Sequence, residues 1–175
     1  VTVADHTLIV NTKRRVKMKP ASGSTPLPTG LIHVKRGFIQ TTYTVKVKDV
    51  NGAEITSQSY TTPKPADAEG NTMAKTDDIA SELFDKLKSA LSDTQWQLKL
   101  LGSTIRIRNT TRDFALEVSD SYGNQALFAI KGSVQKFQDL PPEAEDGFAI
   151  TVEGTDSSTF DNFYVQYKSN PDGAG

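Results

Sequence analysis

Basic side chains that could bind phosphate gather near the start of the chain, at Lys13, Arg14, Arg15, Lys17 and Lys19. The chemistry open to them is contact with DNA phosphates or with an acidic partner. The simpler interpretation is a hairpin turn followed by a solvated strand face, where lysines also protect an exposed edge from aggregation. We favour the simpler interpretation and keep these five residues as candidate contacts with DNA or a partner.

A weaker basic cluster consists of Arg106, Arg108 and Arg112. The first two alternate with Ile105 and Ile107, as expected of a strand with one apolar and one wet face. We therefore interpret these arginines as the solvated face of a strand and the turn after it.

Carboxylates gather around the Pro141-Pro142 corner, at Asp139, Glu143, Glu145 and Asp146. A glycosidase needs two carboxylates at a defined separation across a cleft, so this cluster is the one candidate for such chemistry. An acidic, solvated loop explains the same residues more simply, and we favour that interpretation.

Other site chemistry has little support in the sequence. His6 and His33 are the only histidines, and neither lies in a zinc-binding pattern such as H-E-x-x-H. The chain has no cysteine, which excludes disulfides and thiolate zinc sites. It also lacks a G-x-S-x-G nucleophile elbow, a P-loop and an EF-hand spacing. We expect no catalytic residue, no metal and no cofactor.

The composition is typical of a folded protein and not of a disordered tail or a membrane protein. Hydrophobic residues make up 36% of the 175 residues and charged residues 23%, and no apolar run reaches the ~20 residues of a spanning helix. The net charge is −1, whereas proteins that bind a nucleic-acid backbone usually carry an excess of basic residues. The first residues lack both an initiator Met and the basic and apolar regions of a signal peptide. The last residues have a turn-like sequence without a terminal helix or strand. We therefore expect a fragment of a longer polypeptide.

The first half of the chain is predicted to be mostly strand. We expect a hairpin or edge strands between Thr7 and Met18, and a linker from Pro20 to Gly30, where Pro, Gly and Ser dominate. Residues 31–49 return to strand, with apolar and polar side chains alternating from Tyr43 onward. Asn51-Gly52 predicts a type I′ turn, and residues 53–60 the returning strand.

One amphipathic helix is predicted over about residues 77–92, after a loop at 61–71. Thr76 or Asp77 can cap its first turn, and the end is expected near Ser92 or Asp93. Its apolar face is formed by Ala80, Leu83, Phe84, Leu87 and Leu91.

Three short strands follow the helix, at residues 95–100, 105–108 and 114–118. Because their connections are short, we expect antiparallel neighbours in one sheet, covered on its apolar face by the helix. The run 126–130 could be strand or helix turn. The fold class is therefore α+β and β-rich, an antiparallel sandwich. We expect a β segment and linker at 1–40, an α+β domain at 41–132 and a β-hairpin segment at 133–175.

Aromatic side chains are predicted mainly as core, because most fall on the apolar faces of their own elements. This applies to Phe84, Trp96, Phe114, Phe128, Phe137, Phe148 and Phe163. Tyr164 and Tyr167 fall on opposite sides of a strand, so we expect one of them to be exposed at an interface.

Two stretches resemble a known family. Residues Val3 to Asn11, continued by Lys13 to Met18, resemble the opening segment of tail tubular protein B, the tail nozzle of short-tailed, Autographiviridae-type bacteriophages. Residues Val134 to Lys168 resemble its pattern of a Leu-Pro corner, a Gly-aromatic strand and an aromatic-rich strand. The middle fits in order and spacing, and His6 departs from an expected aromatic.

The resemblance implies an internal portion of a virion protein, assembled in the bacterial cytoplasm. The family forms a homohexameric nozzle that docks onto the adaptor ring (tail tubular protein A), helps to hold the tail fibres and encloses the channel for DNA ejection. No enzymatic residue carries over from these motifs.

Two alternatives stay open. A carbohydrate-binding or carbohydrate-cleaving tail module predicts loss of activity on changing Asp139 or Glu143. A DNA-binding domain centred on residues 13–19 predicts salt-sensitive binding that weakens when Arg14 and Arg15 become alanine.

Overall fold

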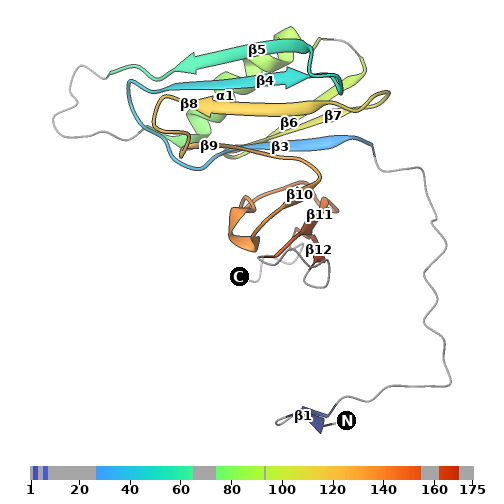
Figure 1. Cartoon of the computed structure of the whole chain (residues 1–175). Helices are drawn as coiled ribbons and strands as arrows, with labels where there is room; N and C mark the ends of the chain where they lie inside the picture. The colour runs from blue at the N-terminus through green and yellow to red at the C-terminus, as the bar shows by residue number, and fades with distance from the viewer. Residues whose placement is uncertain are drawn as a thin grey trace.

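The described part of the computed structural model contains two larger sheets, a smaller third sheet, a two-stranded sheet near the start and one α-helix (Figure 1). The residues that it describes are 2–3, 6–7, 27–64, 74–92, 94–154 and 162–169. Near the start, β1 (Thr2–Val3) pairs antiparallel with β2 (His6–Thr7). This pair is not the hairpin predicted between Thr7 and Met18, which lies outside the described residues apart from Thr7, as do most of the Pro20–Gly30 and 61–71 loops.

The first sheet has four antiparallel strands in the order β6-β7-β3-β9. These are β6 (Trp96–Leu101), β7 (Thr104–Asn109), β3 (Thr29–Val34) and β9 (Leu127–Ile130). Strand β3, which lies in the segment we assigned to residues 1–40, is therefore an inner strand of this sheet. The apolar run at 126–130, left open between helix and strand, forms β9.

The second sheet has three antiparallel strands in the order β5-β4-β8. Strand β4 (Thr42–Lys48) lies between β5 (Glu54–Thr61) and β8 (Ala115–Asp120). Its side chains alternate between buried and half-exposed, as its sequence predicts. The predicted strand at 31–49 is thus two strands in different sheets, separated by a connection in which Gln40 adopts a positive φ of 52°.

The main core lies between these two sheets and is closed by helix α1 (Thr76–Ala90). The helix packs against β5 of one sheet and β6 and β3 of the other, so it spans the sandwich (Figure 1). The fully buried residues come from both sheets and the helix: Ile32, Val34, Tyr43, Val45, Val47, Ile79, Ala80, Leu83, Leu87, Ile105 and Ile107. The α+β class is confirmed.

The helix boundaries and cap differ slightly from the prediction. The helix ends at Ala90 rather than Ser92 or Asp93, and Lys75 precedes it in extended conformation without a side-chain cap. Thr76, predicted as a cap, is instead the first helical residue. The acidic first turn, Asp77 and Asp78, still suits the positive end of the helix dipole.

The β4–β5 hairpin is confirmed, but its turn is not type I′. Only Gly52 has a positive φ, of 88°, whereas a type I′ turn needs positive φ at both central residues. The Asp49 carboxylate accepts hydrogen bonds from the backbone N–H groups of Asn51 and Ala53, at 2.8 and 2.9 Å. These bonds stabilise a wider loop that ends in a glycine with left-handed backbone.

The prediction that the three strands after the helix are neighbours in one sheet is wrong for the third. Strands β6 and β7 do pair, but β8 pairs with β4 in the opposite sheet. The reason is the buried Asn109, whose side-chain oxygen accepts hydrogen bonds at 2.9 Å from the backbone N–H groups of Thr111 and Arg112. This turn directs Phe114 into the core and carries the chain across the sandwich.

The third sheet packs against the outer face of the first. Strand β11 (Ala149–Val152) pairs in parallel with β10 (Ser133–Val134) and antiparallel with β12 (Phe163–Gln166). The β11–β12 pair was predicted. A second apolar cluster joins Leu31 of β3 to this sheet and contains Leu31, Ile130, Val134, Ile150 and Val152. The proposed division at residues 40 and 132 stays a prediction.

Candidate functional site

The basic residues singled out first, Lys13, Arg14, Arg15, Lys17 and Lys19, lie outside the described residues. Their role as contacts for DNA or a partner therefore stays a prediction. Two other features stand out in the described part of the chain: a cluster of charges on the first sheet and an apolar hollow in the third.

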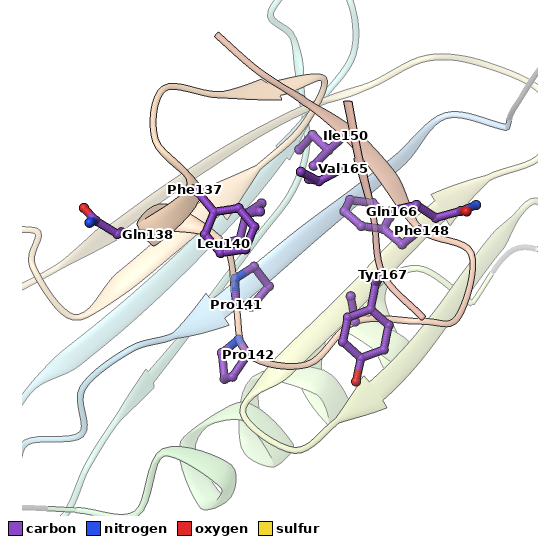
Figure 2. Close-up of a pocket in the computed structure, with 11 residues that line it drawn as sticks. Phe137, Gln138, Leu140, Pro141, Pro142, Phe148, Ile150, Val165, Gln166 and Tyr167 are labelled. Atoms are coloured by element: carbon purple, nitrogen blue, oxygen red, sulfur yellow. The ribbon is translucent and has the colours of Figure 1, made fainter. Parts of the chain in front are cut away.

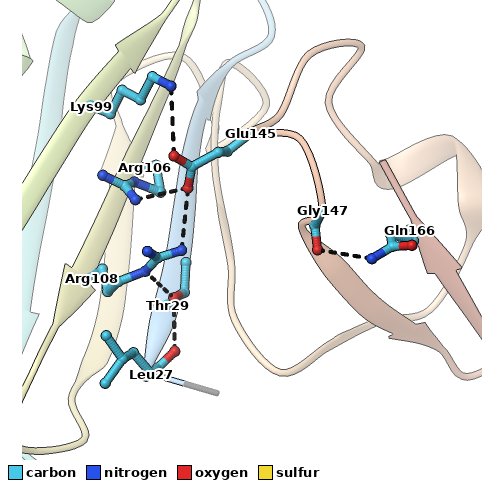
Figure 3. A network of polar contacts seen from close by, with 8 residues as sticks. All are labelled: Leu27, Thr29, Lys99, Arg106, Arg108, Glu145, Gly147 and Gln166. Carbon is cyan, nitrogen blue, oxygen red and sulfur yellow. Dashed lines mark hydrogen bonds and ion pairs between the residues drawn. The ribbon is translucent and has the colours of Figure 1, made fainter. Parts of the chain in front are cut away.

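A three-cation cluster surrounds Glu145 on the outer face of the first sheet (Figure 3). We use this name for Lys99, Arg106 and Arg108. One carboxylate oxygen, Oε2, lies 2.8 Å from Nη1 of Arg106 and 3.2 Å from Nη2 of Arg108. The other, Oε1, lies 3.6 Å from Nζ of Lys99.

Strand alternation places these cations on one face. Ile105 and Ile107 point into the sandwich core, so Arg106 and Arg108 point outward. Lys99 is the cross-strand partner of Arg106 in the β6–β7 pair. The arginines were predicted to form a solvated face, but the Arg106 side chain is only 8% exposed because the third sheet's loop covers it.

Arg108 is held in place from the neighbouring strand. Its Nε donates a hydrogen bond to Oγ1 of Thr29 at 3.1 Å, and that hydroxyl donates to the carbonyl of Leu27 at 2.8 Å (Figure 3). The guanidinium group is thereby oriented toward Glu145. Arg112, the third arginine of the predicted cluster, is exposed and lies outside this arrangement.

The carboxylates of the predicted acidic loop have separate environments. Glu145 lies in the ion cluster, so its description as solvated was wrong. Asp146 accepts hydrogen bonds from the backbone N–H and hydroxyl of Ser169, at 2.8 and 3.1 Å. Asp139 ends a short 3₁₀ turn, η1 (Phe137–Asp139), and Glu143 is exposed. These contacts add no support to a glycosidase pair.

An apolar hollow of about 530 Å³ opens between η1, the Pro141-Pro142 corner and β12 (Figure 2). Side chains lining it include Phe137, Leu140, Pro141, Pro142, Phe148 and Tyr167. Such a lining suits the apolar side chain of a partner and offers little for acid–base chemistry.

Aromatic exposure corrects part of the core prediction. Trp96 and Phe114 are buried and in edge-to-face contact, with ring centroids 5.1 Å apart. Phe137 and Phe163, also predicted as core, are 63% and 47% exposed. Tyr164 is 83% exposed, which matches the expectation for one of the two tyrosines. The third sheet is too small to cover both sides of its own strands, so aromatic side chains remain accessible beside the hollow.

His33 is a structural residue. Its Nδ1 lies 3.0 Å from Oγ1 of Thr104, and burial lowers the pKa of the imidazole. Among the described residues, no group of three or more His, Asp or Glu side chains could hold a metal ion. In that same part of the chain, no helix is both long and apolar enough to cross a membrane.

The model of the bacteriophage nozzle protein family matches residues 1–173. The chain belongs to the bacteriophage nozzle protein family. The nozzle-family resemblance carried by the two ends of the sequence is thereby confirmed over the whole chain.

A curated relative of this nozzle-family chain is tail tubular protein gp12 of Escherichia phage T7. The two are 28% identical over an alignment of 175 positions, which covers 95% of this chain and 21% of the relative. The chain thus spans about a fifth of that relative's length. It is a structural component of a bacteriophage tail, and its location is the tail of the virion.

Proposed function

We propose that the protein containing these residues forms a homohexameric nozzle through which phage DNA is ejected. The observation that carries this proposal is the match of the nozzle family over residues 1–173. The proposal includes docking onto the adaptor ring (tail tubular protein A), attachment of the tail fibres, assembly in the host cytoplasm and a role in host entry.

Accessible apolar surface on the third sheet supports a role in assembly. A ring is built from head-to-tail contacts, in which one surface of a subunit meets a different surface of its neighbour. Exposed aromatics such as Phe137 and Tyr164, beside the apolar hollow, are the residue types enriched in protein interfaces. We propose this sheet as a subunit contact, and we propose the loops at 20–30 and 61–71 as further subunit contacts or as part of the channel wall.

The charge balance supports passage of DNA rather than its retention. With 20 basic and 21 acidic residues, the chain has a net charge of −1. A strongly basic channel wall would hold the phosphate backbone, because affinity for DNA grows with each phosphate that is neutralised. A nearly neutral wall lets the DNA slide.

We propose a structural role without catalysis. The alternative of a carbohydrate-cleaving tail module needs paired carboxylates, and the separate environments of Glu145 and Asp146 do not favour it. Hydrolysis of a polysaccharide that is lost on changing Asp139 or Glu143 would support that alternative instead. Salt-sensitive DNA binding through residues 13–19 is the other alternative.

The deciding experiment is electron microscopy of the full-length protein, purified alone and mixed with its adaptor ring. Six-fold rings or tubes that cap the adaptor are expected. Discrete particles that neither form rings nor bind the adaptor would contradict the nozzle proposal, and the fragment would then be tested against polysaccharides and DNA.

A further inference from the structure

The three-cation cluster has more positive charge than Glu145 can neutralise. Within the described ranges, the ion pairs of Lys99, Arg106 and Arg108 all go to Glu145. Three cations facing one carboxylate leave an excess of positive charge on this part of the sheet. The cluster therefore suits an anion that carries more charge than a carboxylate.

Arg106 also has an unused donor. Its side chain is 8% exposed, and its Nε has no hydrogen-bond partner among the described residues. A buried N–H group without an acceptor is unfavourable, and native proteins rarely leave one. A tetrahedral phosphate offers more acceptor oxygens than a carboxylate, and the planar guanidinium fork binds both groups in the same way.

The three cations and Glu145 lie on separate elements of the fold. Lys99, Arg106 and Arg108 lie on the β6–β7 hairpin, whereas Glu145 lies on the loop that leads into β11 (Figure 3). Because Thr29 orients Arg108 through a hydrogen bond of 3.1 Å, the placement of Arg108 does not depend on Glu145 alone. After removal of the Glu145 carboxylate, Arg108 would therefore still be held in position to bind another anion.

We propose that Lys99, Arg106 and Arg108 form a phosphate-binding site, which Glu145 occupies as an internal substitute for phosphate. The ligand class is a phosphate group, either free or in a nucleic-acid backbone. In the context of the proposed nozzle function, on which this role rests, Glu145 keeps these cations from holding the DNA that passes the protein.

The test compares Glu145→Gln with Glu143→Gln. Both changes remove one negative charge from the same loop, but Glu143 makes no ion pair with the cluster in the described structure. Binding of a labelled mixed-sequence DNA duplex is measured by fluorescence anisotropy, with salt raised from about 20 to about 200 mM. Glu145→Gln is expected to bind DNA at least about tenfold more tightly than the original chain or Glu143→Gln at low salt.

Further variants test whether the gain in DNA affinity comes from the three-cation cluster. Adding Arg108→Gln to Glu145→Gln should remove most of the gain and reduce the salt dependence by the share of one phosphate contact. Glu145→Asp keeps the charge but withdraws the carboxylate by one methylene, and should bind DNA with intermediate affinity. Circular dichroism checks that each variant is folded. If Glu145→Gln does not fold, the DNA affinity of Glu145→Asp tests the proposal in its place.

Calorimetric titration with inorganic phosphate separates the two sources of phosphate. Binding of both phosphate and DNA by Glu145→Gln supports a backbone ligand, and binding of phosphate alone supports a free one. Equal gains in Glu145→Gln and Glu143→Gln, or no gain in the affinity of any Glu145 variant for either phosphate or DNA, would overturn the proposal. Ring formation by the full-length protein is a separate readout, so either proposal can fail without the other.

Discussion

The hydroxyl of Tyr43 accepts a hydrogen bond from the backbone N–H of Phe38 at 2.9 Å. The same hydroxyl donates to the carbonyl of Arg36 at 3.2 Å. Tyr43 lies on β4, whereas the two backbone groups belong to the connection from β3. The buried side chain of Tyr43 thus helps to fix the path by which the chain passes from one sheet of the sandwich to the other, together with the hydroxyl of Thr62, which donates to the carbonyl of Phe38.

Replacement of Tyr43 by phenylalanine tests this contact. The ring still fills the core, but the N–H of Phe38 loses its acceptor, which should lower the free energy of unfolding by about 1–3 kcal/mol. Urea denaturation followed by Trp96 fluorescence measures the change. Tyr60, the cross-strand partner of Tyr43 on β5, provides the control, since Tyr60→Phe should cost less than about 0.5 kcal/mol. Equal costs for the two variants would show that the hydroxyl of Tyr43 has no special role.

The pKa of His33 predicts a loss of stability in acid. Burial, the largest effect, lowers this pKa, and the charge of Lys35 lowers it further, although a hydrogen bond with the Ser103 backbone opposes both. The unfolded chain then binds a proton more readily than the folded one. The contribution to stability is complete above the unfolded pKa of about 6.5 and is lost as pH falls through the lowered folded pKa.

Urea midpoints measured between neutral pH and about pH 5 check this prediction. The original chain should become less stable across this range, and His33→Gln, which cannot titrate, should show a shallower decline. A decline of the same steepness in both would assign the acid sensitivity to other groups.

Two Gly→Ala changes should differ in cost for different reasons. A Cβ on Gly37 would lie 2.0 Å from the backbone oxygen of Ala74, which sits just before the helix. Because backbone cannot move aside cheaply, Gly37→Ala should cost about 3 kcal/mol or more. Gly52 has open space around it but a φ of 88°, so Gly52→Ala should cost only about 1–2 kcal/mol. Thermal unfolding of both variants measures the difference, and a Gly37→Ala protein as stable as Gly52→Ala would show that the approach to Ala74 is loose.

Exposed aromatics on the third sheet should matter for assembly more than for folding. Tyr164 is 83% exposed, so Tyr164→Ser should change the free energy of unfolding by less than about 0.5 kcal/mol. The same change, combined with Phe137→Ser in the full-length protein, should reduce the yield of rings seen by electron microscopy. Val50→Ser, at the exposed tip of the β4–β5 hairpin, is a control of similar exposure. Undiminished rings in the double variant would remove this sheet from the list of subunit contacts.

Local patterns in the sequence predicted the elements well. The helix presents Ala80, Leu83 and Leu87 to the core as its spacing indicates, and β4 alternates as expected. Both predictions depend on the period of a single element, which the sequence shows directly. The nozzle-family resemblance likewise came from two short stretches of consecutive residues.

The pairing of strands that are distant in the sequence could not be predicted from such local patterns. The crossing of β8 to the second sheet depends on the turn made by the buried Asn109, and nothing local distinguishes that turn from a hairpin. The contact of Glu145 with Arg106 joins residues that are 39 positions apart. Alternation correctly placed Arg106 opposite the core face, but only the fold shows that another part of the chain covers it.

The position of β3 inside its sheet has a consequence for synthesis of the chain. This strand pairs with β7 on one side and β9 on the other, whose residues follow it by about 70 to 100 positions. At bacterial translation rates, the last of these partners emerges on the order of 10 s after β3. Until β7 has emerged, Leu31, Ile32 and Val34 have no sheet to join, and the first sheet is complete only when β9 follows. The order of the strands therefore sets the moment in translation at which the sandwich can close.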